Sequence, residues 1–138
     1  MDEFISDIVK INRNAEQIYN LMSDMSFFSQ MASTAQIKEV EDIQSTQDTC
    51  SFTVKGMEVG IQIIDREPYK TIKYTGYKHT PIEFFIWLQL KEIASDDTRV
   101  RIVLRAKLNL MMKTLLKGKI KKGLDKIAHQ ISDSLNQN

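Results

Sequence analysis

Residues 115–135 read LLKGKIKKGLDKIAHQISDSL, and this segment is the most informative one for the architecture of the chain. Its large apolar side chains recur every three or four residues, at Leu116, Ile120, Leu124, Ile127, Ile131 and Leu135. At about 100° per residue they fall in one stripe, which predicts a long amphipathic helix with a single buried face. Gly123 lies at the edge of that stripe, where the missing side chain leaves space or allows another backbone to approach.

This helix is preceded by strand-like segments with short breaks between them. We expect strands at residues 37–43, 49–56, 58–66, 71–78, 82–93 and 98–109. The breaks are polar or carry Gly or Pro, as hairpin connections do. Because a parallel pair needs a crossover of about a dozen residues or more, the sequence predicts consecutive antiparallel strands.

The pairing of the last two strands follows from their alternation of apolar and basic side chains. The register that keeps the apolar set inward places Val100, Ile102, Leu104 and Ala106 opposite Leu90, Leu88, Ile86 and Phe84. Phe85 and Trp87 then lie on the outer face of the sheet. Two adjacent aromatic residues there indicate a homodimer contact or cover by another element; the alternative is that they are isolated surface residues.

The N-terminal part predicts a strand and two short helices. The strand, residues 4–11, places Phe4 and Ile8 on one face and Ile5, Val9 and Ile11 on the other. Asn14 suits a helix N-cap, with Gln17 as its capping-box partner, and Ile18, Leu21 and Met22 form the inward side of a helix to about Ser23. Asp24 or Ser26 caps a second helix, whose inward side is Phe28, Met31 and Ala32.

Composition and charge limit the class of protein. The 138 residues are 42% hydrophobic and 27% charged, as in a soluble globular protein, and we expect one domain over residues 1–138. The net charge of +1 gives no reason to expect nucleic acid as a partner. The longest apolar run, residues 84–88, is too short for stable membrane insertion, and the N-terminus has no signal-peptide pattern. A single cysteine fits a reducing compartment, so we expect a cytoplasmic protein.

Residues that could carry chemistry are few. His79 and His129 are the only histidines, and with Cys50 they show no metal-ligand spacing. Cys50 faces the same way as Phe52 and is interpreted as a small core residue. We therefore predict no catalytic residues, no metal and no cofactor. Tyr74 is the most interesting polar candidate, since a buried phenol needs a partner and could orient a ligand.

Lysines are concentrated in residues 113–126, next to Met111, Met112, Leu115 and Leu116. One interpretation is a surface for anionic lipid headgroups or phosphates. The other is the solvated face of an amphipathic helix. We favour the second, since residues 1–58 carry a net charge of −6 and can complement the +7 of residues 59–138.

The order of elements and one passage carry a family resemblance. Residues 9–24 read VKINRNAEQIYNLMSD: a strand, a small-residue turn, a polar helix start, then an aromatic residue and a leucine before an aspartate. This passage and the order of elements resemble the START / birch-pollen-allergen-like superfamily (SRPBCC), which includes polyketide cyclase and dehydrase-like proteins. The resemblance covers almost the whole chain. It implies an α+β helix-grip fold, in which a curved, seven-stranded antiparallel sheet wraps a long C-terminal helix and two short helices follow the first strand.

The resemblance also implies a cavity between the sheet and the C-terminal helix. Its expected lining is Phe28, Met31, Phe52, Ile61, Ile63, Ile72, Tyr74, Phe84, Ile86, Leu88, Ile102, Leu104, Leu116, Ile120 and Leu124. The alternative is that these side chains simply pack against each other. Residues 27–34, FFSQMAST, lack the Trp-Pro stretch of many family members, a departure that concerns the mouth of the cavity more than the fold.

Three functions follow from this interpretation. The first is binding of a small hydrophobic or amphipathic ligand, a lipid or an aromatic metabolite, in the cavity. The second is an enzyme of the cyclase/dehydrase type that uses the same cavity. The third is a non-catalytic interaction protein with a closed cavity, which uses the Phe85 and Trp87 face to form a homodimer or to bind another partner.

Overall fold

The structure is a computed structural model, which describes residues 1–35, 40–54, 56–78, 80 and 82–136, with the backbone alone for residues 32–35. Eight strands form one antiparallel sheet in the order β1-β8-β7-β6-β5-β4-β3, and β2 pairs with β8 beside β1. The strands are β1 (Asp2–Ile5), β2 (Val9–Ile11), β3 (Val40–Ser45), β4 (Thr49–Val54), β5 (Met57–Glu67), β6 (Thr71–Lys78), β7 (Phe84–Ala94) and β8 (Asp97–Ala106). The six consecutive antiparallel strands expected from the sequence are confirmed, while residues 37–39 of the first lie outside the described part.

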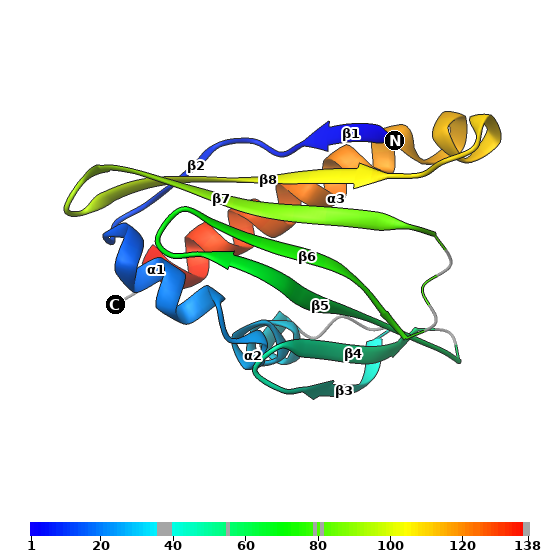
Figure 1. Cartoon of the computed structure of the whole chain (residues 1–138), viewed down its shortest axis with the longest axis horizontal. Helices are drawn as coiled ribbons and strands as arrows, with labels where there is room; N and C mark the ends of the chain where they lie inside the picture. Colours follow the sequence, from blue (N-terminus) through cyan, green and yellow to red (C-terminus); the bar gives the residue numbers. More distant parts are fainter. Residues whose placement is uncertain (36–39, 55, 79, 81, 137–138) are drawn as a thin grey trace.

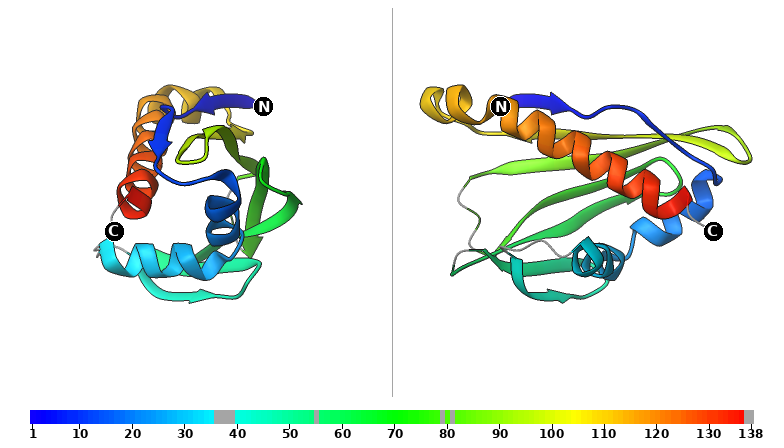
Figure 2. Two further views of the ribbon diagram at one scale, coloured as in Figure 1. Left: turned by 90° about the vertical axis from the view of Figure 1, so that its left-hand side faces the viewer. Right: turned by 180° about the vertical axis from the view of Figure 1, so that it is seen from behind.

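Three helices accompany this sheet: α1 (Ala15–Met22), α2 (Met25–Ala35) and α3 (Leu110–Asn136). The sheet is curved, and α3 runs across its concave side, with α2 near the β3–β4 end (Figure 1). An end-on view shows the strands bending from β1 to β3 while α3 and α2 lie across the inside of the curve (Figure 2). None of the helices in the described ranges has both the length and the apolar character needed to cross a membrane.

The expected first strand, residues 4–11, is divided in two by a one-residue shift in register. β1 pairs Phe4 with Leu104, whereas β2 pairs Val9 with Val100. The break falls at Ser6, whose backbone N still donates to Ile102 O at 2.9 Å, while its side-chain Oγ accepts the hydrogen bond from Ile102 N at 2.8 Å. The shift turns both Phe4 and Val9 into the core, so the expectation that they lie on opposite faces is wrong.

The same shift leaves the two isoleucines near the break in solvent. Ile8 is 63% exposed and Ile5 is 38% exposed, whereas Ile11 is fully buried. A single alternating strand would have placed Ile8 with Phe4 in the core.

The start of α1 confirms the predicted capping box. Gln17 N donates to Asn14 Oδ1 at 2.8 Å, and Asn14 N donates to Gln17 Oε1 at 3.2 Å. Ile18 and Met22 are fully buried, while Leu21 is at the exposed edge of the helix. For α2 the capping residue is Asp24, whose Oδ1 accepts from Ser26 N at 2.9 Å, and the hydrogen bonds from Ser26 lower the pKa of the Asp24 carboxyl.

The predicted register of β7 and β8 is confirmed at every inward pair. Phe84, Ile86, Leu88 and Leu90 lie opposite Ala106, Leu104, Ile102 and Val100. Phe85 and Trp87 accordingly pair with Arg105 and Val103 on the outer face of the sheet.

The buried face of α3 is rotated relative to the apolar stripe in its sequence. Ala128 and Ser132 are buried, while Ile127 is 41% exposed. Small side chains are needed there because α3 lies close to β2, where Ser132 Oγ and Asn136 Nδ2 donate to Lys10 O at 2.8 and 3.0 Å. At Gly123 an added Cβ would meet no atom within 4 Å, so this glycine leaves space and serves no close backbone approach.

Candidate functional site

An apolar cavity of about 250 Å³ lies between the sheet, α2 and the C-terminal half of α3. The sheet and α2 contribute Met25, Phe28, Met31, Val40, Ile43, Cys50, Phe52, Ile61, Tyr74, Ile86, Leu88 and Ile102, and α3 contributes Leu124, Ile127, Gln130 and Ile131. Nearly all of these side chains are aliphatic or aromatic, so the cavity favours an apolar occupant.

The structure brings nine of the fifteen expected lining residues to this cavity. They are Phe28, Met31, Phe52, Ile61, Tyr74, Ile86, Leu88, Ile102 and Leu124. They come from elements that are separated in sequence, and the antiparallel register aligns their inward faces.

Six expected residues do not line the cavity. They are Ile63, Ile72, Phe84, Leu104, Leu116 and Ile120. Ile63 and Ile72 are buried in the hydrophobic core itself. The other four lie toward the end of the sheet where α3 begins, because Phe84 and its neighbours pair with the last residues of β8. The cavity faces only the second half of α3.

The residues that sequence reasoning missed are Met25, Val40, Ile43, Cys50, Ile127, Gln130 and Ile131. Ile131 belongs to the apolar stripe and Cys50 shares the parity of Phe52, so a sequence signal existed for both. Ile43 had none: β3 shifts register between Glu41 and Gln44, and Asp42 there has a φ of 51°. This bulge gives Val40 and Ile43 the same face, against simple alternation.

Tyr74 supplies the most informative polar atom of the cavity. Its hydroxyl is buried and has no hydrogen-bond partner among the described residues, the one side-chain atom there for which this holds. Burial raises the pKa of this phenol well above its usual value, so the hydroxyl stays protonated at neutral pH and can donate. Its ring is held edge-to-face by Phe28, with centroids 6.0 Å apart. Buried tyrosine hydroxyls usually find a partner, so this one is available to a ligand.

The other candidate groups offer no reactive centre. Burial raises the pKa of the Cys50 thiol, which keeps it protonated and a poor nucleophile. His129 is exposed on α3, with Nε2 3.1 Å from Asp7 Oδ2. His79 lies outside the described residues. Within the described ranges, no cluster of His, Cys, Asp and Glu could hold a metal ion.

The cavity reaches the surface beside α3. Ile127 lines it and is also 41% exposed, while Phe28, Met31 and Gln130 are half-buried. Phe28 and Met31 belong to α2, and Ile127 and Gln130 belong to α3, so a ligand could enter between these two helices.

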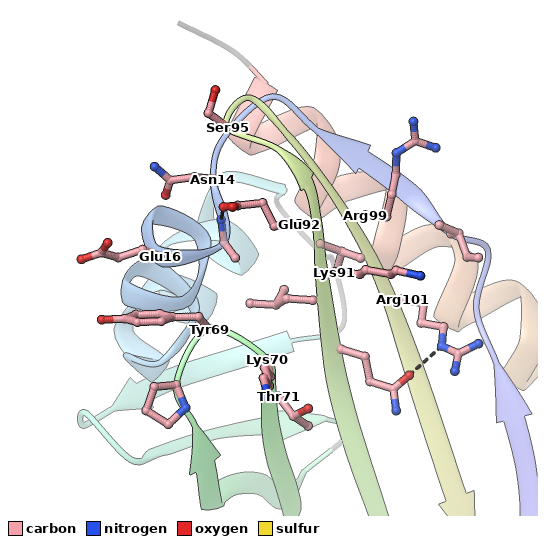
Figure 3. Close-up of a pocket in the computed structure, with 16 residues that line it drawn as sticks. Asn14, Glu16, Tyr69, Lys70, Thr71, Lys91, Glu92, Ser95, Arg99 and Arg101 are labelled. Carbon is pink, nitrogen blue, oxygen red and sulfur yellow. Dashed lines mark hydrogen bonds between the residues drawn. The ribbon is translucent and has the colours of Figure 1, made fainter.

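A second hollow, a wide groove of about 1070 Å³ lined by many charged and polar residues, lies near the β7–β8 hairpin and the start of α1. Figure 3 shows Lys91, Arg99 and Arg101 on one side of it, with Glu16 and Tyr69 on the other. Several of its polar groups already bind protein atoms: Arg101 Nε donates to Gln89 Oε1 at 2.6 Å, and Glu92 Oε1 accepts from Ala15 N at 2.8 Å. The apolar cavity, with its unpartnered hydroxyl, is the better candidate site.

The outer-face aromatics form a pair that neighbouring cations partly cover. The Phe85 and Trp87 rings lie 6.2 Å apart between centroids. Lys73 Nζ lies 4.9 Å from the Phe85 centroid, and the Arg105 guanidinium carbon lies 5.5 Å from that of Trp87. Both rings are half-buried, so they are not isolated surface residues, and the homodimer contact stays a prediction.

Comparison with known proteins identifies the fold. No family model and no curated protein matches this chain. Among solved structures, norcoclaurine synthase from Thalictrum flavum matches with a TM-score of 0.76 and 10% identity, over 99% of this chain and 87% of that one. A conserved protein from Geobacillus kaustophilus matches with a TM-score of 0.69 and 12% identity, over 98% and 95% of the two chains.

A third match is the di-domain ARO/CYC BexL, with a TM-score of 0.73 and 8% identity. It covers 96% of this chain but 46% of BexL. These identities are low, and the likeness concerns the arrangement of the backbone. The chain therefore has the helix-grip fold that its sequence predicts, a fold that it shares with norcoclaurine synthase and BexL.

Proposed function

We propose that this protein binds a small apolar molecule that carries a hydrogen-bond acceptor, in the cavity between the sheet, α2 and α3. The observation that carries the proposal is the Tyr74 hydroxyl, a buried donor without a partner among the described residues, in a lining that is otherwise almost entirely apolar. An unmade buried hydrogen bond costs about 1–3 kcal/mol, and a ligand acceptor would recover it.

The size of the cavity supports a single-ring molecule or a short chain. An apolar cavity of about 150 Å³ is enough for benzene, and drug-sized ligands need about 300 Å³ or more. A volume near 250 Å³ therefore suits one ring with a polar substituent. A norcoclaurine synthase structure of the same fold is described in complex with dopamine and hydroxybenzaldehyde, two molecules of this kind.

Titration with hydroxybenzaldehyde, followed by calorimetry, tests the proposal. We expect binding to wild type and an affinity about fivefold lower in Tyr74→Phe, since one neutral hydrogen bond contributes about 1 kcal/mol. Toluene, which has the ring but no acceptor oxygen, should bind both proteins equally. Tyr77→Phe is the matched control, because Tyr77 is on the other face of β6. If Tyr74→Phe and Tyr77→Phe lost the same hydroxybenzaldehyde affinity, the Tyr74 hydroxyl would not be the group that binds the ligand.

A second candidate function is an enzyme of the cyclase/dehydrase type. The buried, protonated Tyr74 phenol favours it, because such a donor can polarise a carbonyl group. The described lining adds no carboxylate, lysine or imidazole to act as a base, which favours binding over catalysis. Chromatography of mixtures of dopamine and hydroxybenzaldehyde decides between them: a product formed by wild type and lost in Tyr74→Phe would identify an enzyme.

A further inference from the structure

The start of α3 exposes large apolar side chains to solvent. Leu110 is 81% exposed, Met111 is 72% exposed and Leu115 is 66% exposed. This first part of the helix extends past the end of the sheet, so no strand covers it (Figures 1 and 2). Met111 and Leu115, four residues apart, lie on one side of the helix and form an apolar patch that folding leaves in water, while Leu110 points to another side.

The lysines of α3 are only partly complemented by the acidic N-terminal residues. Lys113 pairs with Asp2 at 2.9 Å, and Lys121 pairs with Asp125 at 2.7 Å and Asp7 at 3.4 Å. Four others are exposed and form no ion pair within the part of the chain that the structure describes: Lys117, Lys119, Lys122 and Lys126. The sequence-based expectation that the acidic half neutralises this surface holds for two of six lysines.

Apolar and basic residues share one side of the helix. Met111, Leu115, Lys119, Lys122 and Lys126 are spaced four, four, three and four residues apart, and this spacing forms one line along a helix. Opposite this line are the buried residues Leu124, Ala128 and Ile131. We call residues 111, 115, 119, 122 and 126 the outward face of α3.

We propose that the outward face of α3 adsorbs to anionic lipid bilayers. The apolar first turns would enter the headgroup region while the lysines contact the charged headgroups, which is the pattern of helices that lie in a membrane interface. A nucleic acid would use the lysines but would leave Met111 and Leu115 in water, so a bilayer fits both parts of the surface. The proposal does not depend on what the cavity binds.

The position of this face relates it to the cavity. Ile127 lines the cavity, is partly exposed and follows Lys126 directly in the helix. Gln130, one turn further on, also lines the cavity. At about 100° per residue, Ile127 and Gln130 lie on the flank of α3 between the outward face and the buried side, so the cavity lies beside the outward face and not within it.

Vesicle flotation with the full chain tests the proposal, with phosphatidylcholine vesicles and vesicles containing about 30 mol% phosphatidylglycerol, in about 0.1 M salt. We expect binding to the anionic vesicles alone. A Lys119→Ala, Lys122→Ala, Lys126→Ala variant should bind about a hundredfold more weakly, since each lysine near such a surface contributes about fivefold. A Met111→Ser, Leu115→Ser variant should lose at least about tenfold.

The control variant carries Lys91→Ala and Ile93→Ser, at residues exposed near the β7–β8 turn. It should bind vesicles as wild type does, and thermal melting checks that every variant is folded. The proposal is overturned if the wild-type protein does not bind anionic vesicles. It is also overturned if the control variant loses as much vesicle affinity as the variants of the outward face. So does binding to duplex RNA that exceeds vesicle binding and is unaffected by Met111→Ser and Leu115→Ser.

Discussion

At the scale of single residues, the Tyr74 hydroxyl has two consequences that do not require a ligand. It is buried without a partner in the described structure, so in the ligand-free protein it costs stability and keeps its proton. Both consequences can be measured on the purified protein, and both follow from the position of Tyr74 on β6 alone.

Tyr74→Phe should stabilise the ligand-free protein. Removing an unsatisfied buried hydroxyl should raise the free energy of unfolding by about 1 kcal/mol. Urea unfolding measures the change, with Tyr77→Phe expected to stay within about 0.5 kcal/mol of wild type. A destabilised Tyr74→Phe protein would mean that the hydroxyl is hydrogen-bonded after all.

The pH dependence of stability should differ between wild type and Tyr74→Phe. Burial raises the pKa of Tyr74 in the folded state, whereas a tyrosine in the unfolded chain titrates near pH 10. Above about pH 10 the unfolded state therefore loses a proton that the folded state keeps, and wild type loses stability relative to Tyr74→Phe. Parallel stability curves for the two proteins from about pH 8 to 11 would contradict this assignment.

At the scale of elements, local breaks in alternation decide which side chains meet. The capping box of α1, the antiparallel order and the β7–β8 register follow from sequence patterns, because each depends on neighbours in the chain or on a long alternating run. The breaks at Ser6 and Asp42 do not follow from sequence patterns, since each is a shift of one residue in strand register. A side-chain hydrogen bond accompanies the shift at Ser6, and a left-handed backbone accompanies the shift at Asp42. The apolar stripe of α3 likewise does not predict which of its turns meets the cavity, and in the structure Leu116 and Ile120 do not line it.

Ser6→Ala tests whether that hydrogen bond holds the break between β1 and β2. The substitution leaves Ile102 N buried without the Ser6 Oγ acceptor, so we expect a loss of about 1–3 kcal/mol in the free energy of unfolding. Ser95→Ala, at an exposed residue of the β7–β8 turn, is the control and should have little effect. An unchanged urea midpoint in Ser6→Ala would show that the backbone pairing alone sets the shift.

At the scale of the whole molecule, the predicted homodimer through Phe85 and Trp87 remains open to measurement. If these rings form the interface, wild type sediments as a dimer and a Phe85→Ser, Trp87→Ser variant sediments as a monomer. Lys73 and Arg105 flank the rings, so a partner copy would bring like charges together, and dimerisation should strengthen with added salt. If both proteins sedimented as monomers, the prediction of a homodimer through Phe85 and Trp87 would be wrong.

The curved sheet and α3 together produce the feature on which the proposed function depends, an apolar space that the protein's own side chains do not fill. Leu124 lines this space, while Ile120, one turn earlier on α3, does not. The two positions therefore offer a matched pair: Leu124→Trp should fill the cavity with its own side chain, and Ile120→Trp should leave the cavity volume unchanged. Overpacking costs about 1–3 kcal/mol, so folding of each variant is checked by thermal melting.

Native mass spectrometry of protein purified from its own host, with gentle desolvation, tests the occupied cavity most directly. We predict a reproducible adduct of small mass on wild type and on Ile120→Trp, and its loss from folded Leu124→Trp. A wild-type protein that carries no adduct, or an adduct retained by Leu124→Trp, would contradict the account.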